Sequence, residues 1–249
     1  MGKRMIYQTF AELYDELFDP AMYQQWLDFV RRELPDQSGE ILELACGTGR
    51  LAVLLAQAGY HVTGLDLSDN MLALAEQHAE EAEVPLPLVA GNMLDLSEIG
   101  KFSAVTCFAD SFCYLQDLSQ VQTAFTQVAA HLADKGKFLF DVITPYQTDE
   151  IYPGYMYNYR DEERAFMWTS YASEDYAHGA EHDLSFFIWN ADKRAFDEVS
   201  ELHRERTYVL ADYQTALAAA GFSKVQVTAD FGRSTPDDKT TRWFFDCQK

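Results

Sequence analysis

A short apolar segment followed by two glycines limits the folds open to this chain more than any other feature. Residues 41–44 are largely apolar, as in a buried parallel strand, and Gly47 and Gly49 then allow a tight turn. The Ala- and Leu-rich segment 48–58 predicts a helix that ends at Gly59. A strand, a glycine turn and a helix N-terminus form the front of a nucleotide-binding α/β unit, although a purely structural turn would show the same glycines.

The residues around this turn indicate which nucleoside would bind. The next predicted strand ends in Asp66, and an acid there can accept hydrogen bonds from both hydroxyls of a ribose. Gly47, Gly49 and Ala52 also fit the fingerprint of dinucleotide enzymes, and Asp66 would suit NAD equally well. Glu43 would repel a pyrophosphate but attract a ligand that carries an ammonium and a sulfonium. The residues therefore favour S-adenosylmethionine, and an NAD(P)-dependent oxidoreductase remains the alternative.

The two motifs together resemble those of a known enzyme family. Glu43-Leu-Ala-Cys-Gly-Thr-Gly49 and Gly64-Leu-Asp-Leu-Ser-x-x-Met-Leu72 are similar to motifs of class I S-adenosylmethionine-dependent methyltransferases. The likeness is closest to small-molecule members such as glycine/sarcosine and aminosugar N-methyltransferases, and it covers residues 5–145 and 205–249. It implies a Rossmann-like α/β fold with a seven-stranded, mostly parallel sheet. Two late strands, at 225–229 and 242–247, would form the antiparallel closing hairpin.

The resemblance also implies the residues of a cofactor site. Glu43 and the turn backbone would hold the amino-acid end of S-adenosylmethionine, and Asp66 would hold the ribose. A helical cap at residues 1–34 would close over the methionine tail through Tyr14, with Tyr7 and Trp26 as further candidates, although helix packing explains such aromatic residues equally well. The predicted cofactor-binding residues are Tyr14, Glu43, Ala45, Gly47, Gly49, Asp66, Leu67, Asn92, Met93, Phe108 and Ala109.

Composition excludes several other classes of function. The 249 residues are 48% hydrophobic, which is enough for one large α/β domain with an elaboration. The formal charge of −21 disfavours nucleic acid as a partner, because such a surface repels phosphate backbones. The sequence lacks long apolar runs and a signal core, so we expect a cytoplasmic protein without a membrane partner. Its four cysteines show no C-x-x-C spacing, which indicates reduced core thiols rather than disulfides or metal ligands.

A change in aromatic content and in hydrophobic periodicity divides the chain into two parts. Residues 146–210 contain 14 of the 35 aromatic residues and alternate with period two, which predicts three or four antiparallel strands. Residues 1–145 and 211–249 would form the cofactor-binding domain. Because the insertion follows the fifth strand of the predicted sheet, we expect it to be a lid over the cofactor cleft. A homodimer interface through the insertion is the alternative, and both roles are compatible.

The predicted reaction is transfer of a methyl group to the N or O atom of a small-molecule acceptor by in-line displacement. The sulfonium already activates the methyl group, so the protein mainly aligns the reactants and excludes water. Asp110 follows the fourth predicted strand and is the candidate general base. His178, His182 and His203 fall in the insertion, where we expect solvated or structural roles. A non-catalytic S-adenosylmethionine-binding protein would carry the same cofactor motifs and is a second alternative.

Overall fold

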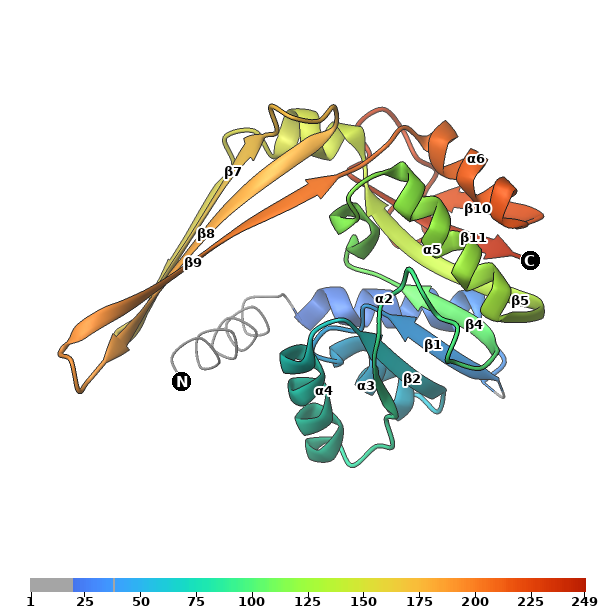
Figure 1. Ribbon diagram of the computed structural model, residues 1–249, viewed down its shortest axis with the longest axis horizontal. Coiled ribbons are helices and arrows are strands. Elements are labelled where there is room, and N and C mark those ends of the chain that lie inside the picture. The colour runs from blue at the N-terminus through green and yellow to red at the C-terminus, as the bar shows by residue number, and fades with distance from the viewer. Residues whose placement is uncertain (1–19, 38) are drawn as a thin grey trace.

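The computed structural model describes residues 20–37 and 39–249, which form two β-sheets (Figure 1). The larger sheet has seven strands in the order β10-β11-β5-β4-β1-β2-β3. Strands β1 to β5 pair in parallel, whereas β11 pairs antiparallel with both β5 and β10. The predicted fold class, with its antiparallel closing hairpin, is therefore confirmed. The strands are β1 (Glu40–Leu44), β2 (His61–Asp66), β3 (Leu88–Ala90), β4 (Phe102–Cys107), β5 (Leu132–Ile143), β10 (Lys224–Thr228) and β11 (Arg242–Gln248).

Helices bury both faces of the large sheet. Alternate residues of a strand point to opposite faces, so Ile41 packs against the helices of one face and Leu42 against those of the other. The helices α2 (Pro20–Glu33) and α3 (Arg50–Gln57) cover the first face, and α5 (Leu118–His131) and α6 (Leu210–Ala220) cover the second. A further helix, α4 (Asp69–Glu81), contacts α3, β2 and β3.

Local sequence signals explain several helix ends. The Ser68 side chain accepts a hydrogen bond from the Met71 amide at 3.3 Å, as an N-cap of α4 does. Gly221 ends α6 with a φ of 98°, a conformation that glycine adopts without strain. The sequence, with an Asp just before an Ala-rich run, predicts Asp212 as the N-cap of α6. This prediction is wrong, because the helix begins at Leu210 without a side-chain cap and Asp212 lies in its first turn. An acid is favourable there too, because it faces the positive end of the helix dipole.

The smaller sheet consists of four antiparallel strands in the order β6-β7-β8-β9 (Figure 1). Its strands are β6 (Met156–Arg160), β7 (Arg164–Ala172), β8 (Gly179–Asn190) and β9 (Ala195–Arg206), all within the insertion that the aromatic pattern marked. One end of this sheet adjoins the large domain, and the β8–β9 hairpin projects away from it. Two short helical turns, η1 (Ser111–Tyr114) and η2 (Gln147–Ile151), contact β9 and β8 respectively.

The two faces of the smaller sheet differ in character. Register pairs Tyr157 with Trp168, Phe166 with Phe186, and His182 with both Ser170 and His203, so these side chains share one face. The alternation of Phe187 and Trp189, which also marked β8 in the sequence, belongs to the opposite face. Because Phe186 and Phe187 are adjacent, the period-two pattern does not show which face of β8 is the buried one. Tertiary packing decides which face is buried.

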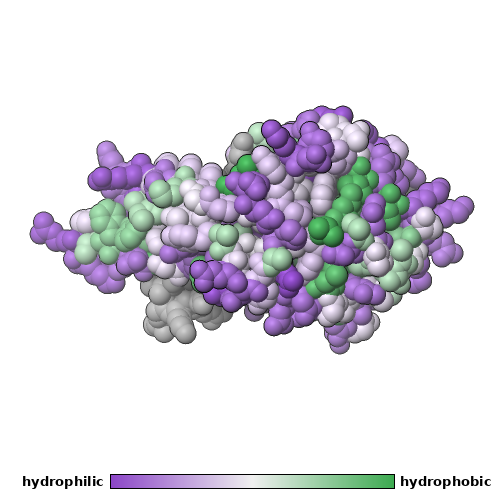
Figure 2. Space-filling view, turned by 90° about the horizontal axis from the view of Figure 1, so that it is seen from above, coloured by the Kyte–Doolittle hydropathy of each residue, from purple (hydrophilic) through white to green (hydrophobic). Residues whose placement is uncertain are grey.

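Hydrophilic residues cover most of the face shown in Figure 2, as expected from the strong negative charge. Within the part of the chain that the structure describes, no helix has the length and apolar character needed to cross a membrane.

Candidate functional site

A cavity of about 420 Å³ lies at the carboxyl ends of β1, β2 and β4. Parallel α/β sheets bind their ligands at this edge because the connecting turns leave a crevice there. Nine of the predicted cofactor residues line the cavity: Glu43, Ala45, Gly47, Asp66, Leu67, Asn92, Met93, Phe108 and Ala109. We refer to this space as the first cavity. Tyr14 and Tyr7 lie outside the described residues, and Trp26 is part of the lining.

Glu43 is the unusual group of the first cavity. Its side chain is 4% exposed, and its Oε2 atom makes no hydrogen bond with any described residue. Burial, and secondarily the charge of Asp66, raises the pKa of Glu43 from 4.5 to about 8. A buried carboxylate oxygen without a donor is unfavourable unless a ligand supplies one. Glu43 therefore suits a ligand with a cationic donor.

Asp66 holds the glycine turn through both of its oxygens. Its Oδ2 accepts from the Gly47 amide and its Oδ1 from the Ser68 amide, each at 2.8 Å. Each carboxylate oxygen has a second acceptor position, so hydrogen bonds from ligand hydroxyls remain open to it. The same residue thus shapes the turn and faces the cavity.

Two alanines with unusual backbone angles line the first cavity, one after each of the paired strands β1 and β4. Ala45 after β1 and Ala109 after β4 have φ values of 51° and 55°, which are strained for residues other than glycine. Gly49 has a φ of 74° but does not line the cavity. A Cβ atom on Gly49 would lie 2.7 Å from that of Ala75 in α4, so this glycine permits the turn and the close packing of α4.

Asn92 lines the first cavity and also stabilises the turn that contains it. Its Oδ1 accepts a hydrogen bond from the Leu94 amide at 3.0 Å and so shapes the turn after β3. Its second lone pair and its amide group are available to a ligand.

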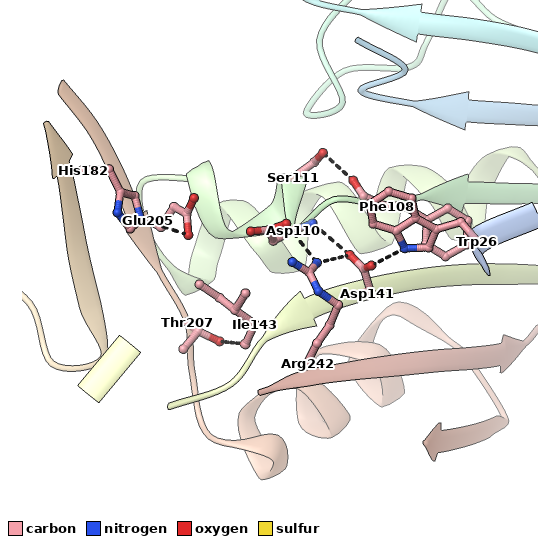
Figure 3. Close-up of polar contacts among 10 residues, drawn as sticks. All are labelled: Trp26, Phe108, Asp110, Ser111, Asp141, Ile143, His182, Glu205, Thr207 and Arg242. Atoms are coloured by element: carbon pink, nitrogen blue, oxygen red, sulfur yellow. Dashed lines mark hydrogen bonds and ion pairs between the residues drawn. The ribbon is translucent and has the colours of Figure 1, made fainter. Parts of the chain in front are cut away.

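Asp110 belongs to a buried network that joins four parts of the chain (Figure 3). Its Oδ1 accepts from Arg242 of β11 at 2.9 Å, and Arg242 also donates to Asp141 of β5 at 3.0 Å. Asp141 accepts in turn from the Asp110 amide at 2.8 Å and from Trp26 of α2 at 2.7 Å. The network fixes the turn after β4 against the cap helix and the closing hairpin.

The environment of Asp110 sets its protonation. Burial raises its pKa most, Arg242 opposes that effect, and Glu205 and Asp141 raise it further, giving about 6. A carboxylate with such a pKa is ionised at neutral pH and can still accept a proton, which suits a general base.

A second cavity, of about 380 Å³, lies between the turn after β4 and one face of the smaller sheet. This face carries Phe166, Trp168 and Phe186, and we refer to it as the aromatic face. The two cavities share Ala109, Tyr114 and His203 in their linings. The sheet contributes residues from all four strands, and the large domain contributes Asp110 and Arg242. The remaining lining residues are Met22, Tyr152, Tyr155, Tyr157, Phe166, Trp168, His182, Leu184, Phe186 and Glu205.

Comparison with known proteins agrees with this geometry. Residues 41–136 match the family model described as a methyltransferase domain. A methyltransferase homologue of Geobacillus sp. (strain WCH70) is 38% identical over 98% of this chain and 100% of its own length. The dTDP-3-amino-3,6-dideoxy-alpha-D-glucopyranose N,N-dimethyltransferase of Streptomyces fradiae is 31% identical over 78% of this chain and 73% of its own. An S-adenosylmethionine-dependent methyltransferase of Clostridium acetobutylicum superposes with a TM-score of 0.83 at 25% identity, covering 97% of this chain and 98% of that one.

This chain belongs to the class I S-adenosylmethionine-dependent methyltransferases. The methyltransferase uses S-adenosylmethionine to methylate a small-molecule acceptor, and neither an oxidoreductase nor a non-catalytic binder is supported. The first cavity fits this cofactor, because the unpaired Oε2 of Glu43 suits an ammonium and Asp66 retains acceptor positions for ribose hydroxyls.

Sequence reasoning missed most of the polar residues that the methyltransferase places around the second cavity. Arg242, Glu205 and Tyr114 were absent from the prediction, and His203 was expected to be structural. Arg242 is 132 positions from its partner Asp110, so no local motif connects them. The one usable signal was the alternation of β9, which puts His203 and Glu205 on the same face.

Proposed function

We propose that the first cavity holds S-adenosylmethionine in the orientation implied by the sequence. Glu43 and the backbone of residues 45–47 would bind the amino-acid end, Asp66 the ribose, and Leu67, Asn92 and Met93 the adenine. The backbone at Phe108 and Ala109 would lie beside the methionine tail, where Tyr14 stays a prediction. The bound cofactor supplies a methyl group that its sulfonium already activates.

The second cavity is the proposed acceptor site. The observation that carries this proposal is the shared lining of the two cavities by Ala109, Tyr114 and His203. A donor and an acceptor bound on either side of these residues would meet there. Alignment and exclusion of water then supply most of the rate enhancement.

Asp110 is the proposed general base for this reaction. It lines the acceptor cavity, and its network with Arg242 and Asp141 holds it in place. A pKa of about 6 keeps it ready to take a proton from an N or O acceptor at neutral pH.

The smaller sheet is the proposed lid of the acceptor site. Its aromatic face turns toward the cavity, and its polar face carries Glu181, Asp183 and Arg204. A homodimer through the projecting end of this sheet is a compatible proposal, supported by the exposed side chains of Trp189 and Phe196. Four buried thiols support a reducing, cytoplasmic location.

Ligand binding tests the proposed function directly. S-adenosylhomocysteine should raise the melting temperature of the purified protein, because it binds the native state alone. NAD and NADP at equal concentration should have little effect. Stabilisation by NAD without stabilisation by S-adenosylhomocysteine would refute the proposed site, and mass spectrometry of ligand retained during purification gives an independent check.

A further inference from the structure

Glu205 is a buried carboxylate in the second cavity without a role in the ion-pair network of Asp110. Its side chain is about 6% exposed, and its Oε2 accepts no hydrogen bond from any described residue. The contact that it makes is with Nε2 of His182, at 3.5 Å, which is too long for a strong hydrogen bond (Figure 3). A carboxylate that is buried in this way is complementary to a ligand that donates hydrogen bonds.

Hydrogen bonds within the smaller sheet fix the ring of His182. Trp168 donates its indole N–H to Ser170 Oγ at 2.8 Å, and that oxygen lies 2.7 Å from Nδ1 of His182. The hydroxyl hydrogen of Ser170 is then free to point at Nδ1, which leaves the ring proton of neutral His182 on Nε2. His182 thus turns an N–H toward Glu205 across 3.5 Å without forming a hydrogen bond to it, and the ring has no free nitrogen on that side to act as a base.

The charges around the cavity are unbalanced. Among the described residues, the three buried carboxylates of Asp110, Asp141 and Glu205 lie near one guanidinium, that of Arg242. Arg242 already donates to Asp110 and Asp141, and within the described part of the chain Glu205 faces neutral His182 instead of a lysine or arginine. Such a site repels an anionic acceptor and attracts a cationic one.

Aromatic rings surround the same space. Tyr152 stands edge-on to His182 at 4.6 Å, and Tyr155 stands edge-on to Trp168 at 5.4 Å. Ring faces attract ammonium groups, and they also cover the apolar part of a small ligand.

We propose that Glu205 binds the ammonium group of the acceptor, and that the acceptor is a small protonated amine. This inference rests on the proposed acceptor site. In the reaction, one N–H proton moves to the carboxylate of Asp110. The lone pair of the amine then forms the new N–C bond as the C–S bond breaks, which leaves a methylated ammonium and S-adenosylhomocysteine.

A paired panel of amines and alcohols tests the proposal. 2-Phenylethylamine, cyclohexylamine and glucosamine are compared with 2-phenylethanol, cyclohexanol and glucose, by calorimetry with saturating S-adenosylhomocysteine and by transfer of labelled methyl groups. At least one amine should bind ten times more tightly than its alcohol and become methylated. Equal or better binding of the alcohols, or no binding of any amine, would overturn the inference.

Substitutions test whether Glu205 itself, and not its neighbours, binds the amine. Glu205→Gln should lose at least tenfold in amine affinity and lose the preference over the alcohol, while Glu205→Asp should recover part of it. Glu198→Gln, an exposed change on the same strand, is the matched control and should behave as wild type. His182→Gln should reduce the amine preference without changing the affinity for S-adenosylhomocysteine. If Glu205→Gln is folded and binds amines normally, the assignment is wrong.

The same measurements test the amine proposal and the proposed cofactor site separately. Binding of S-adenosylhomocysteine together with methylation of alcohols in place of amines would refute the amine proposal and leave the methyl transfer site intact. Failure to bind S-adenosylhomocysteine in the wild-type protein would refute the proposed cofactor site itself.

Discussion

Replacing Glu43 with Gln should make the ligand-free protein more stable and the cofactor-bound protein less so. The folded protein holds a proton on Glu43 up to a pKa of about 8, whereas the unfolded chain loses it near 4.5. Between these values the folded state binds more protons than the unfolded state, so this group lowers the free energy of unfolding as the pH rises. Gln has the same shape and no proton to lose, so this destabilisation disappears.

The magnitude follows from the two pKa values. At about 1.4 kcal/mol for each pH unit between them, the destabilisation from Glu43 reaches about 4 kcal/mol at pH 8 and is less than about 1 kcal/mol at pH 5. In a chain of this length, each kcal/mol corresponds to roughly 2–4 °C of melting temperature. Glu43→Gln without ligand should therefore melt clearly higher than wild type at pH 8 and at nearly the same temperature at pH 5.

Cofactor binding should show the opposite sign. The ammonium of S-adenosylhomocysteine pairs with the ionised carboxylate, so binding to wild type at pH 7 should release close to one proton, measured by calorimetry in buffers of different ionisation enthalpy. Glu43→Gln should release none and should bind roughly 100-fold more weakly, because a charged hydrogen bond is lost. Glu40→Gln, at the exposed start of the same strand, is the control. A variant with unchanged pH dependence of stability and unchanged ligand affinity would refute the reasoning.

Three further perturbations test the other parts of the site. Asp66→Ala should cost roughly 2–3 kcal/mol of S-adenosylhomocysteine binding in calorimetry, and it should also lower the melting temperature, because two turn amides lose their acceptor; Asp238→Ala, at an exposed position outside the helices and strands, should do neither. Asp110→Asn should abolish a rise in kcat/KM with pH through about 6 while leaving S-adenosylhomocysteine affinity unchanged, and a retained rise would assign it to another group. Replacing residues 154–204 with a Gly/Ser linker should preserve cofactor binding and remove methyl transfer; normal transfer with a changed elution volume on a sizing column would make the sheet an assembly surface instead of a lid.

The linker variant leaves parts of the sequence-marked insertion in place because they pack into the large domain. Thr207 Oγ1 donates to the carbonyl of Ile143 at 2.6 Å, and Tyr208 belongs to the core between the sheet and α5 and α6. At the other end, Thr148 is fully buried. A composition boundary does not show these contacts, because aromatic residues occur on both sides of it.

The sequence predicted most of the residues that line the first cavity, because the signals for them are local. Each strand of the parallel sheet is followed at once by the turn that faces the cavity. Glu43 and Asp66, at the carboxyl ends of β1 and β2, and Asn92, just after β3, could therefore be placed from the strand pattern. Gly49 was the exception within the described residues. Its positive φ is visible as a glycine in the sequence, but its packing against Ala75 depends on how α4 lies over α3.

The acceptor half depends on contacts that no motif carries. Asp110 was placed correctly at the strand edge, yet its pairing with Arg242 joins the fourth strand to the last one. Likewise, the position of Glu205 depends on the register of β9 against β8, where one step would turn its carboxylate to the polar face. Side chains selected by register and by distant pairing are not deducible from spacing alone.

The proposed cofactor and acceptor sites are carried by different parts of the molecule, and this separation has a functional consequence. The proposed cofactor contacts lie on turns that follow the buried strands of the large sheet, where Asp66 accepts from the Gly47 amide and Ala45 has a positive φ. The residues of the proposed acceptor site come mostly from one face of a separate sheet, where side chains can change without disturbing that core. Substitutions on that face should therefore alter acceptor choice before they alter cofactor affinity. The unpaired carboxylate of Glu205 lies at the point on this face where such a change would matter most, because its charge, more than the shape of the cavity, separates amines from alcohols.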